Sequence, residues 1–148
     1  MGILNVTPDS FSDGGKYLDP NDAIARGLEM LAEGVDIIDV GGESTRPGAQ
    51  RISEDEELNR VLPVISELIE AGAKVSVDTM RASVAERSGA HIINDVSGGK
   101  ADPQMFATVA KLDKPYILMH WRGHSTEMDN KAIYDDVVAE VISELETQ

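Results

Sequence analysis

Residues 1–15, MGILNVTPDSFSDGG, join a short apolar segment to a long polar loop. The apolar part, Gly2 to Val6, predicts a β-strand that is buried on both faces, which is typical of a parallel sheet. The loop carries hydroxyl and carboxylate side chains and one Phe before it ends at Gly14 and Gly15. Loops at strand ends hold the chemistry of α/β folds, although a turn with Asp as a helix cap explains the same composition.

The rest of the chain repeats this order of strand, loop and helix. Ser53 with Glu56 fits a capping box, and Gly34 and Gly72 are typical of helix ends. Because strands alternate with helices, the sequence predicts a parallel sheet with helices outside it, as a barrel or as an open sheet. The later strands are predicted at about 35–40, 74–78, 91–94 and 115–120, and helices from about 19, 53, 81, 102 and 131.

Two connections carry sharper expectations. Residues 79–90 must leave one strand, form a helix and return, so we expect a single helical turn there or a break near Gly89. The last helix is predicted from Lys131 to Glu146, with inward apolar side chains at Val137, Val138, Val141, Ile142 and Leu145.

The composition predicts one globular domain over residues 1–148. The net charge of −14 argues against nucleic acid and anionic membranes as partners. No apolar run approaches the ~20 residues of a membrane helix, and no signal peptide precedes the first strand, so we expect the cytoplasm. The chain has no Cys, which excludes disulfide and thiolate chemistry.

Five segments of the chain resemble the dihydropteroate synthase family. They occur in the same order as in that family and are NVTPDSFSDGG at 5–15, GGESTRPGA at 41–49, VSVDTMRA at 75–82, INDVSGG at 93–99 and YILMHWRG at 116–123. The resemblance implies a TIM (β/α)₈ barrel, of which this chain supplies five βα units. It also implies the condensation of a dihydropterin diphosphate with p-aminobenzoate to 7,8-dihydropteroate, with Mg²⁺ on the diphosphate.

The family carries further functional residues on later strands: an Asp, a Lys and a Ser-Arg-x-His set. Their strands would lie beyond Gln148, so we expect the chain to need further sequence or a second copy to complete its barrel. The resemblance implies a homodimer for the full-length protein.

Polar residues end several of the predicted strands. Asn5 ends the first, Asp78 the third, and Asn94 and Asp95 the fourth. A carboxylate and an amide at adjacent strand ends could bind the donor and acceptor edge of a flat heterocycle, although helix capping explains them as well. The resemblance assigns Asp78 and Asn94 to pterin binding and Asn5 to Mg²⁺, and leaves Asp95 open.

The loops after the first two strands supply the remaining candidates. Arg46 lies among hydroxyl and Gly residues and could form a bidentate pair with a diphosphate. The resemblance places Thr45, Arg46 and Pro47 at the pterin and p-aminobenzoate end, where sulfonamides compete. Apolar walls for the aminobenzoate ring would come from Phe11 and Pro47. The candidate catalytic residues are Asp9, Asp13 and Arg46.

Met119, His120 and Arg122 follow the fifth strand. Met119 matches a family residue that packs on the pterin, although a lone Met is more often part of a core. His120 could be a general base or a structural residue, and the roles of His120 and Arg122 stay open. We expect His91 to be structural and His124 to be solvated.

Two rival functions remain. Another pterin-binding barrel, such as a methyltetrahydrofolate methyltransferase, would share Asp78 and Asn94, but the TPDSFSDGG and STRPG loops argue against it. An inactive or truncated paralogue would bind a pterin without turnover.

Overall fold

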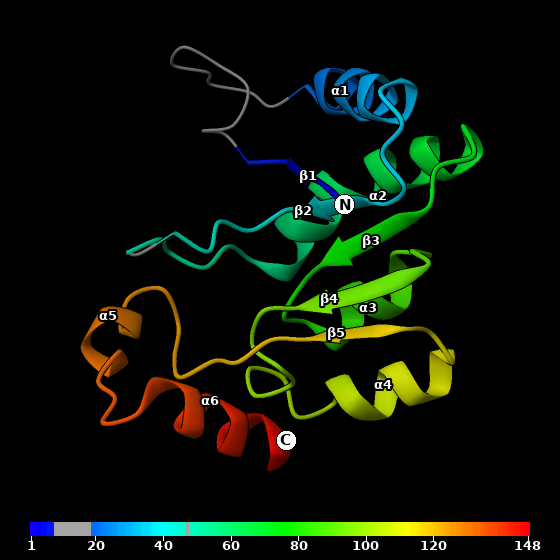
Figure 1. Ribbon diagram of the computed structural model, residues 1–148. Helices are drawn as coiled ribbons and strands as arrows, with labels where there is room; N and C mark the ends of the chain where they lie inside the picture. Colours follow the sequence, from blue (N-terminus) through cyan, green and yellow to red (C-terminus); the bar gives the residue numbers. More distant parts are fainter. Residues whose placement is uncertain (8–18, 47) are drawn as a thin grey trace.

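A single parallel sheet forms the centre of the molecule. The computed structural model describes residues 1–7, 19–46 and 48–148. Within them the strands lie side by side in chain order, as Figure 1 shows. They are β1 (Gly2–Asn5), β2 (Ile38–Gly41), β3 (Val75–Asp78), β4 (Ile92–Asp95) and β5 (Tyr116–Leu118). The predicted alternation of strand and helix is confirmed.

Helices follow the strands; the first four connect successive strands on one face of the sheet, and the last two come after β5 (Figure 1). They are α1 (Pro20–Ala32), α2 (Glu54–Glu70), α3 (Ala82–Arg87), α4 (Met105–Leu112), α5 (Met128–Lys131) and α6 (Val137–Glu146). Ser53 caps α2 by accepting from Glu56 N at 3.2 Å, as the capping box predicts. Helix α3 has six residues, more than the single turn expected but less than two turns.

The two faces of the sheet differ in chemistry. Leu4, Val40, Val77 and Ile93 pair in register and are all buried in the core against the helices. The core is closely packed, because a Cβ atom at Gly27 of α1 would lie only 2.6 Å from Leu68 Cδ2 of α2. The opposite, inner face carries polar residues at Asn5, Asp39, Ser76, Asp78 and Asn94.

The expectation that the first strand is buried on both faces was wrong, whereas all four residues of β2 are buried. Ile3 on the inner face of β1 is 64% exposed, and Ile117 on β5 is also exposed. Among the described residues β1 pairs only with β2, and β5 only with β4, so the sheet has two open edges, while Asp39 and Ser76 on the inner face of the central strands are buried.

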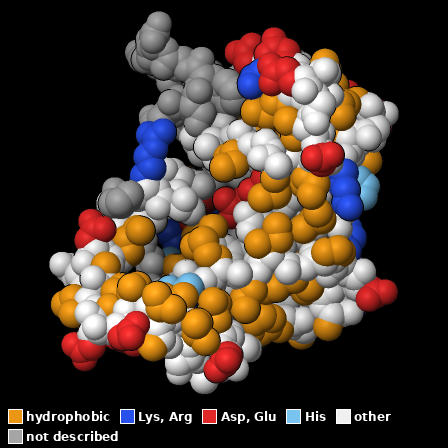
Figure 2. Space-filling model, in the orientation of Figure 1, with side chains coloured by type: hydrophobic (Ala, Val, Ile, Leu, Met, Phe, Trp, Pro, Cys, Tyr) orange, Lys and Arg blue, Asp and Glu red, His pale blue; other side chains and the backbone are white. Residues whose placement is uncertain are grey.

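The prediction for the last helix was right at its end, Glu146, but wrong at its start and in the burial of its side chains. Residues 132–136 are not helical, and α6 begins anew where Asp136 accepts from Val138 N and Ala139 N. Its expected inward side chains are not buried, and Val138 is 66% exposed. Figure 2 shows the apolar side chains of this region at the surface. No helix in the described part of the chain is long and apolar enough to cross a membrane.

Candidate functional site

Four residues form a row across the carboxyl end of the sheet. Asn5, Gly41, Asp78 and Asn94 are register partners on β1 to β4 and share the inner face. A Cβ atom at Gly41 would lie 3.4 Å from Asp78 Oδ2 and 3.7 Å from Asn5 Oδ1. Gly41 therefore leaves open space between the Asn5 amide and the Asp78 carboxylate, and the structure brings together three of the predicted site residues.

Asp39 lies beneath this row and was missed in the sequence. Its Oδ2 atom accepts a hydrogen bond from Asn94 Nδ2 at 2.9 Å, and the residue is only 4% exposed. Asp39 Oδ1 and Ser76 Oγ are buried and have no hydrogen-bond partner within the described residues. The two-residue period of the strand could have revealed Asp39, because it shares a face with Gly41.

Asp78 lies in an environment that disfavours its charge. Burial, together with repulsion from Asp39 and more distant carboxylates, raises the pKa of Asp78 from its ordinary value of 3.8 to about 7. A ligand that donates hydrogen bonds to this carboxylate would favour its ionised form. A carboxyl group with so strongly shifted a pKa at a strand end is a candidate ligand-binding group.

A cluster of charged side chains fixes the loop after β2. Arg81 Nη1 donates to Glu43 Oε2 at 2.8 Å and to Glu57 Oε2, while Thr79 Oγ1 donates to Glu57 Oε1 at 2.6 Å. Arg51 Nε binds the other oxygen of Glu43 at 2.9 Å. Burial raises the pKa of Glu57, and the hydrogen bond from Thr79 and the charge of Arg81 oppose that rise. The cluster ties the loop bearing Thr45 and Arg46 to the segment that follows Asp78.

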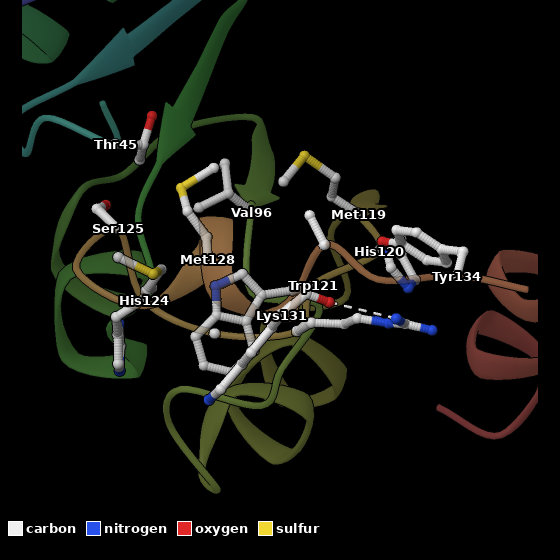
Figure 3. Close-up of a pocket in the computed structure, with 14 residues that line it drawn as sticks. Thr45, Val96, Met119, His120, Trp121, His124, Ser125, Met128, Lys131 and Tyr134 are labelled. Atoms are coloured by element: carbon white, nitrogen blue, oxygen red, sulfur yellow. Dashed lines mark hydrogen bonds between the residues drawn. The ribbon is translucent and has the colours of Figure 1, made fainter. Parts of the chain in front are cut away.

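A mostly apolar cavity of about 340 Å³ lies among the segments that follow the carboxyl ends of β2 to β5 (Figure 3). Thr45 from the loop after β2 and Met119 from the end of β5 both line it, as do Val96 and Trp121. Arg46 is exposed on the same loop, and it is not among the described residues lining the cavity. The cavity therefore joins two predicted substrate residues that are 74 positions apart in sequence.

His120 and Arg122 face helix α6. His120 Nε2 lies 2.9 Å from Glu144 Oε2, and Arg122 Nη2 donates to Glu140 and Glu144. The hydrogen bonds of Arg122 and then of His120 lower the pKa of Glu144 to about 2. The Arg122 guanidinium lies 3.8 Å from the centre of the Tyr134 ring. Both residues therefore hold the segment 121–146 in place.

Asp95 and His91 have structural contacts. Asp95 is fully buried and accepts from Ser97 N, Ser97 Oγ, Gly99 N and Tyr116 OH at 2.7–2.9 Å. These four bonds stabilise the turn after β4. The role of Asp95, which the sequence leaves open, is therefore structural. His91 Nδ1 accepts from Val75 N at 3.1 Å, as expected for a structural His. His124 is half-buried against the Trp121 ring, so the expectation that it is solvated was wrong.

The other predicted site residues, Asp9, Phe11, Asp13 and Pro47, lie outside the described residues. In the part of the chain that the structure describes, no group of three or more His, Asp or Glu side chains could hold a metal ion. The Asn5 amide oxygen, beside the open space at Gly41, is a suitable single ligand for Mg²⁺, because this ion takes few protein ligands when phosphates supply others.

Comparisons with known proteins agree with this arrangement. The family model described as "Pterin binding enzyme" matches residues 1–148. The dihydropteroate synthase of Mycobacterium leprae is 56% identical over 149 residues, which cover 98% of this chain and 52% of that protein. The chain thus spans about half the length of this curated relative.

Two solved structures are also similar. The dihydropteroate synthase of Yersinia pestis with a sulfonamide drug complex has a TM-score of 0.88 and 42% identity, over 99% of this chain and 54% of that one. The Xanthomonas albilineans dihydropteroate synthase with 4-aminobenzoic acid has a TM-score of 0.85 and 46% identity, over 99% of this chain and 52% of that one. The five-stranded sheet is accordingly part of a TIM-type barrel. The matched family model, these similarities and the neighbouring strand-end residues Asp78 and Asn94 agree. The chain belongs to the family of pterin-binding enzymes.

Proposed function

We propose that the full-length protein is a dihydropteroate synthase, which joins a dihydropterin diphosphate to p-aminobenzoate. Residues 1–148 would form the amino-terminal part of its single pterin-binding domain. The observation that carries this proposal is the pairing of Asp78 with Asn94 at the strand ends, beside a cavity lined by Thr45 and Met119. The relatives from Mycobacterium leprae and Yersinia pestis, which are similar over nearly the whole chain, are named dihydropteroate synthases.

The pterin would bind along the row of polar residues. Asp78 would accept hydrogen bonds from the ring N–H and the amino group, and Asn94 can both donate and accept. Met119, exposed at the end of β5, would pack on the ring face. Asp78 is favoured for this task because its surroundings disfavour a free negative charge there.

The second substrate and the diphosphate would bind at the loops after β1 and β2. Thr45 and Arg46 would contact the diphosphate and the aminobenzoate, and Phe11 and Pro47 would supply apolar walls. Asp9 and Asp13 stay candidate catalytic residues of the first loop. Asn5 would hold Mg²⁺, which supplies positive charge to the departing diphosphate.

The reaction needs no covalent intermediate on the enzyme. The aniline nitrogen attacks the methylene carbon of the pterin, the bond from that carbon to the diphosphate oxygen breaks, and the nitrogen loses one proton. Electron density from the pterin ring stabilises the positive charge that develops at the methylene carbon. Asp78 and Asn94 orient the ring, and Arg46 stabilises the negative charge of the departing group.

Calorimetry on the full-length protein tests the proposed pterin site. Asp78→Ala and Asn94→Ala should each weaken binding of 6-hydroxymethylpterin by about tenfold or more, because a buried ligand group loses its partner. Asp36→Ala is the matched control, because Asp36 is an exposed carboxylate before β2, at the amino end of the strands. Unchanged pterin affinity in both site variants would contradict the assignment.

A turnover assay separates the proposed synthase from its rivals. Formation of 7,8-dihydropteroate from the two substrates supports the proposal. Pterin binding without turnover would indicate an inactive paralogue, and methyl transfer from a methylated folate would indicate the methyltransferase class. The homodimer and the cytoplasmic location stay predictions, and light scattering and cell fractionation check them.

A further inference from the structure

We propose that Asp39 is a positioning residue: it fixes the orientation of the Asn94 amide and thereby determines which heterocycle edge the protein accepts. This inference rests on the proposed pterin site, and it adds a specificity determinant to it. Its basis is the contact between Asn94 Nδ2 and Asp39 Oδ2, which lie 2.9 Å apart beneath the row of strand-end residues.

The contact crosses a whole strand. Asp39 lies on β2 and Asn94 on β4, and β3 runs between them. The residue of β3 that pairs with Asp39 is Ser76, whose small side chain leaves room for the Asp39 carboxylate to reach Asn94. Asp39 is 4% exposed and Ser76 is fully buried, so the carboxylate is enclosed and its position is well defined.

The chemistry of a carboxylate fixes the amide. An ionised carboxylate only accepts hydrogen bonds, so the Asn94 nitrogen must face Asp39 and the Asn94 oxygen must point elsewhere. One N–H and the Oδ1 atom of Asn94 then remain for a ligand. Together with the neighbouring Asp78, the strand ends offer two acceptor groups, the Asp78 carboxylate and Asn94 Oδ1. They also offer one donor, the remaining N–H of Asn94.

This pattern matches an aminopyrimidine edge. In such a ring an amino group lies between two ring nitrogens. The amino group and a ring N–H can donate to the Asp78 carboxylate and to Asn94 Oδ1, and the other ring nitrogen can accept from the remaining N–H of Asn94. A 2-oxo analogue has an acceptor where the amino group would be, so its oxygen would face the oxygens of Asp78 and Asn94. Binding sites built on hydrogen bonds strongly reject ligands that leave those groups unpaired.

A packing role alone does not account for Asp39. An enclosed carboxylate costs free energy unless its charge is compensated, and Asp39 Oδ1 has no hydrogen-bond partner within the described residues. Its charge also opposes ionisation of the neighbouring Asp78. An apolar residue would fill the same space without these costs, which favours a task for the carboxylate at Asn94.

The experiment measures affinity for two ligands, 6-hydroxymethylpterin and its 2-oxo analogue, by calorimetry on the full-length protein. Asp39→Asn keeps the shape of the side chain but can present either an oxygen or an N–H to Asn94. We expect it to lower the affinity ratio between the pterin and the analogue by about tenfold or more. Ser76→Ala removes a buried hydroxyl on the same face and should leave that ratio unchanged.

A double-mutant cycle separates positioning from general damage. If Asp39 acts through Asn94, Asp39→Asn should have no further effect on the ratio once Asn94→Ala is present. The thermal midpoint of each variant reports folding separately. A full effect of Asp39→Asn in the Asn94→Ala background, or an unchanged ratio in the single variant, would overturn the inference. If Asn94→Ala itself leaves pterin affinity unchanged, the proposed pterin site fails instead.

Discussion

Arg81 Nη1 lies 2.8 Å from Glu43 Oε2, and this ion pair links the loop after β3 to the loop after β2. Arg81 follows Asp78 by three residues, and Glu43 precedes Thr45 by two. The two halves of the proposed substrate site are therefore held by one guanidinium group. Glu57 of α2 accepts from the same nitrogen, with its side chain only 1% exposed.

Removal of Arg81 should destabilise the fold. In Arg81→Gln the buried Glu57 loses its cation, and we expect the free energy of unfolding to fall by about 3 kcal/mol, the range for breaking a buried ion pair. Denaturant unfolding measures the change. Adding Glu57→Gln to this variant should restore part of the loss, because no uncompensated charge remains.

Arg51→Gln is the control for Arg81. Arg51 also binds Glu43, but its side chain is 35% exposed, so we expect a loss below about 1 kcal/mol. If Arg81→Gln and Arg51→Gln lose equal free energy of unfolding, the burial of Glu57 does not strengthen its ion pair with Arg81.

The two adjacent glycines after β2 should respond differently to alanine. In Gly41→Ala the new methyl group would contact Asp78 and Asn5 at ordinary distances, so the fold should tolerate it while pterin affinity falls. In Gly42→Ala the Cβ atom would lie 2.7 Å from Val61 Cγ1, and overpacking of this kind costs about 1–3 kcal/mol. Calorimetry with the pterin and thermal unfolding separate the two effects. Loss of stability in Gly41→Ala with unchanged affinity would contradict the open space assigned between Asn5 and Asp78.

Asp78 should make pterin binding depend on pH. Since the pKa of Asp78 is raised to about 7 in the ligand-free protein, a donor edge that needs the carboxylate should bind more tightly as pH rises from about 5 to 8. Asp78→Asn should remove this dependence. Without ligand the sign is opposite: the folded state binds the extra proton, so this group lowers stability as pH rises from about 4 to 7. A pH-independent affinity in the unmodified protein would contradict the raised pKa.

Asp95 should matter for folding rather than for the ligand. Asp95→Ala removes the acceptor of four hydrogen bonds, and we expect a loss of about 2 kcal/mol or more. Pterin affinity measured below the unfolding transition should stay within about threefold of the unmodified protein. A large loss of affinity without loss of stability would move Asp95 into the ligand site.

The sequence predicted the order of the elements because their signals are local. Apolar strands, the capping box at Ser53 and the glycine stops at Gly34 and Gly72 lie within a few residues of the structures that they specify. Asp78 and Asn94 became candidates because both end apolar strands, but helix capping explained them as well, and the family resemblance assigned them to pterin binding. Asp39 was missed because it lies inside the second strand, between Ile38 and Val40, rather than at its end.

Contacts between distant segments could not be predicted. The cluster around Arg81 joins residues from the loop after β2, from α2 and from the turn after β3, and no periodicity in the sequence encodes that meeting. The start of the last helix was predicted too early, because Asp136, which caps a new helix start, lies inside the predicted range. A hydrophobic pattern alone does not show where a helix is interrupted.

A crystal structure of the full-length protein with 6-hydroxymethylpterin tests the central claim most directly. The account predicts that nitrogen atoms of the aminopyrimidine edge lie 2.7–3.2 Å from the Asp78 carboxylate and the Asn94 amide, the range of ordinary hydrogen bonds. It also predicts that Asn94 Nδ2 keeps its hydrogen bond to Asp39 in that complex. A pterin bound in the cavity near Trp121 without contact to Asp78 or Asn94 would contradict the account.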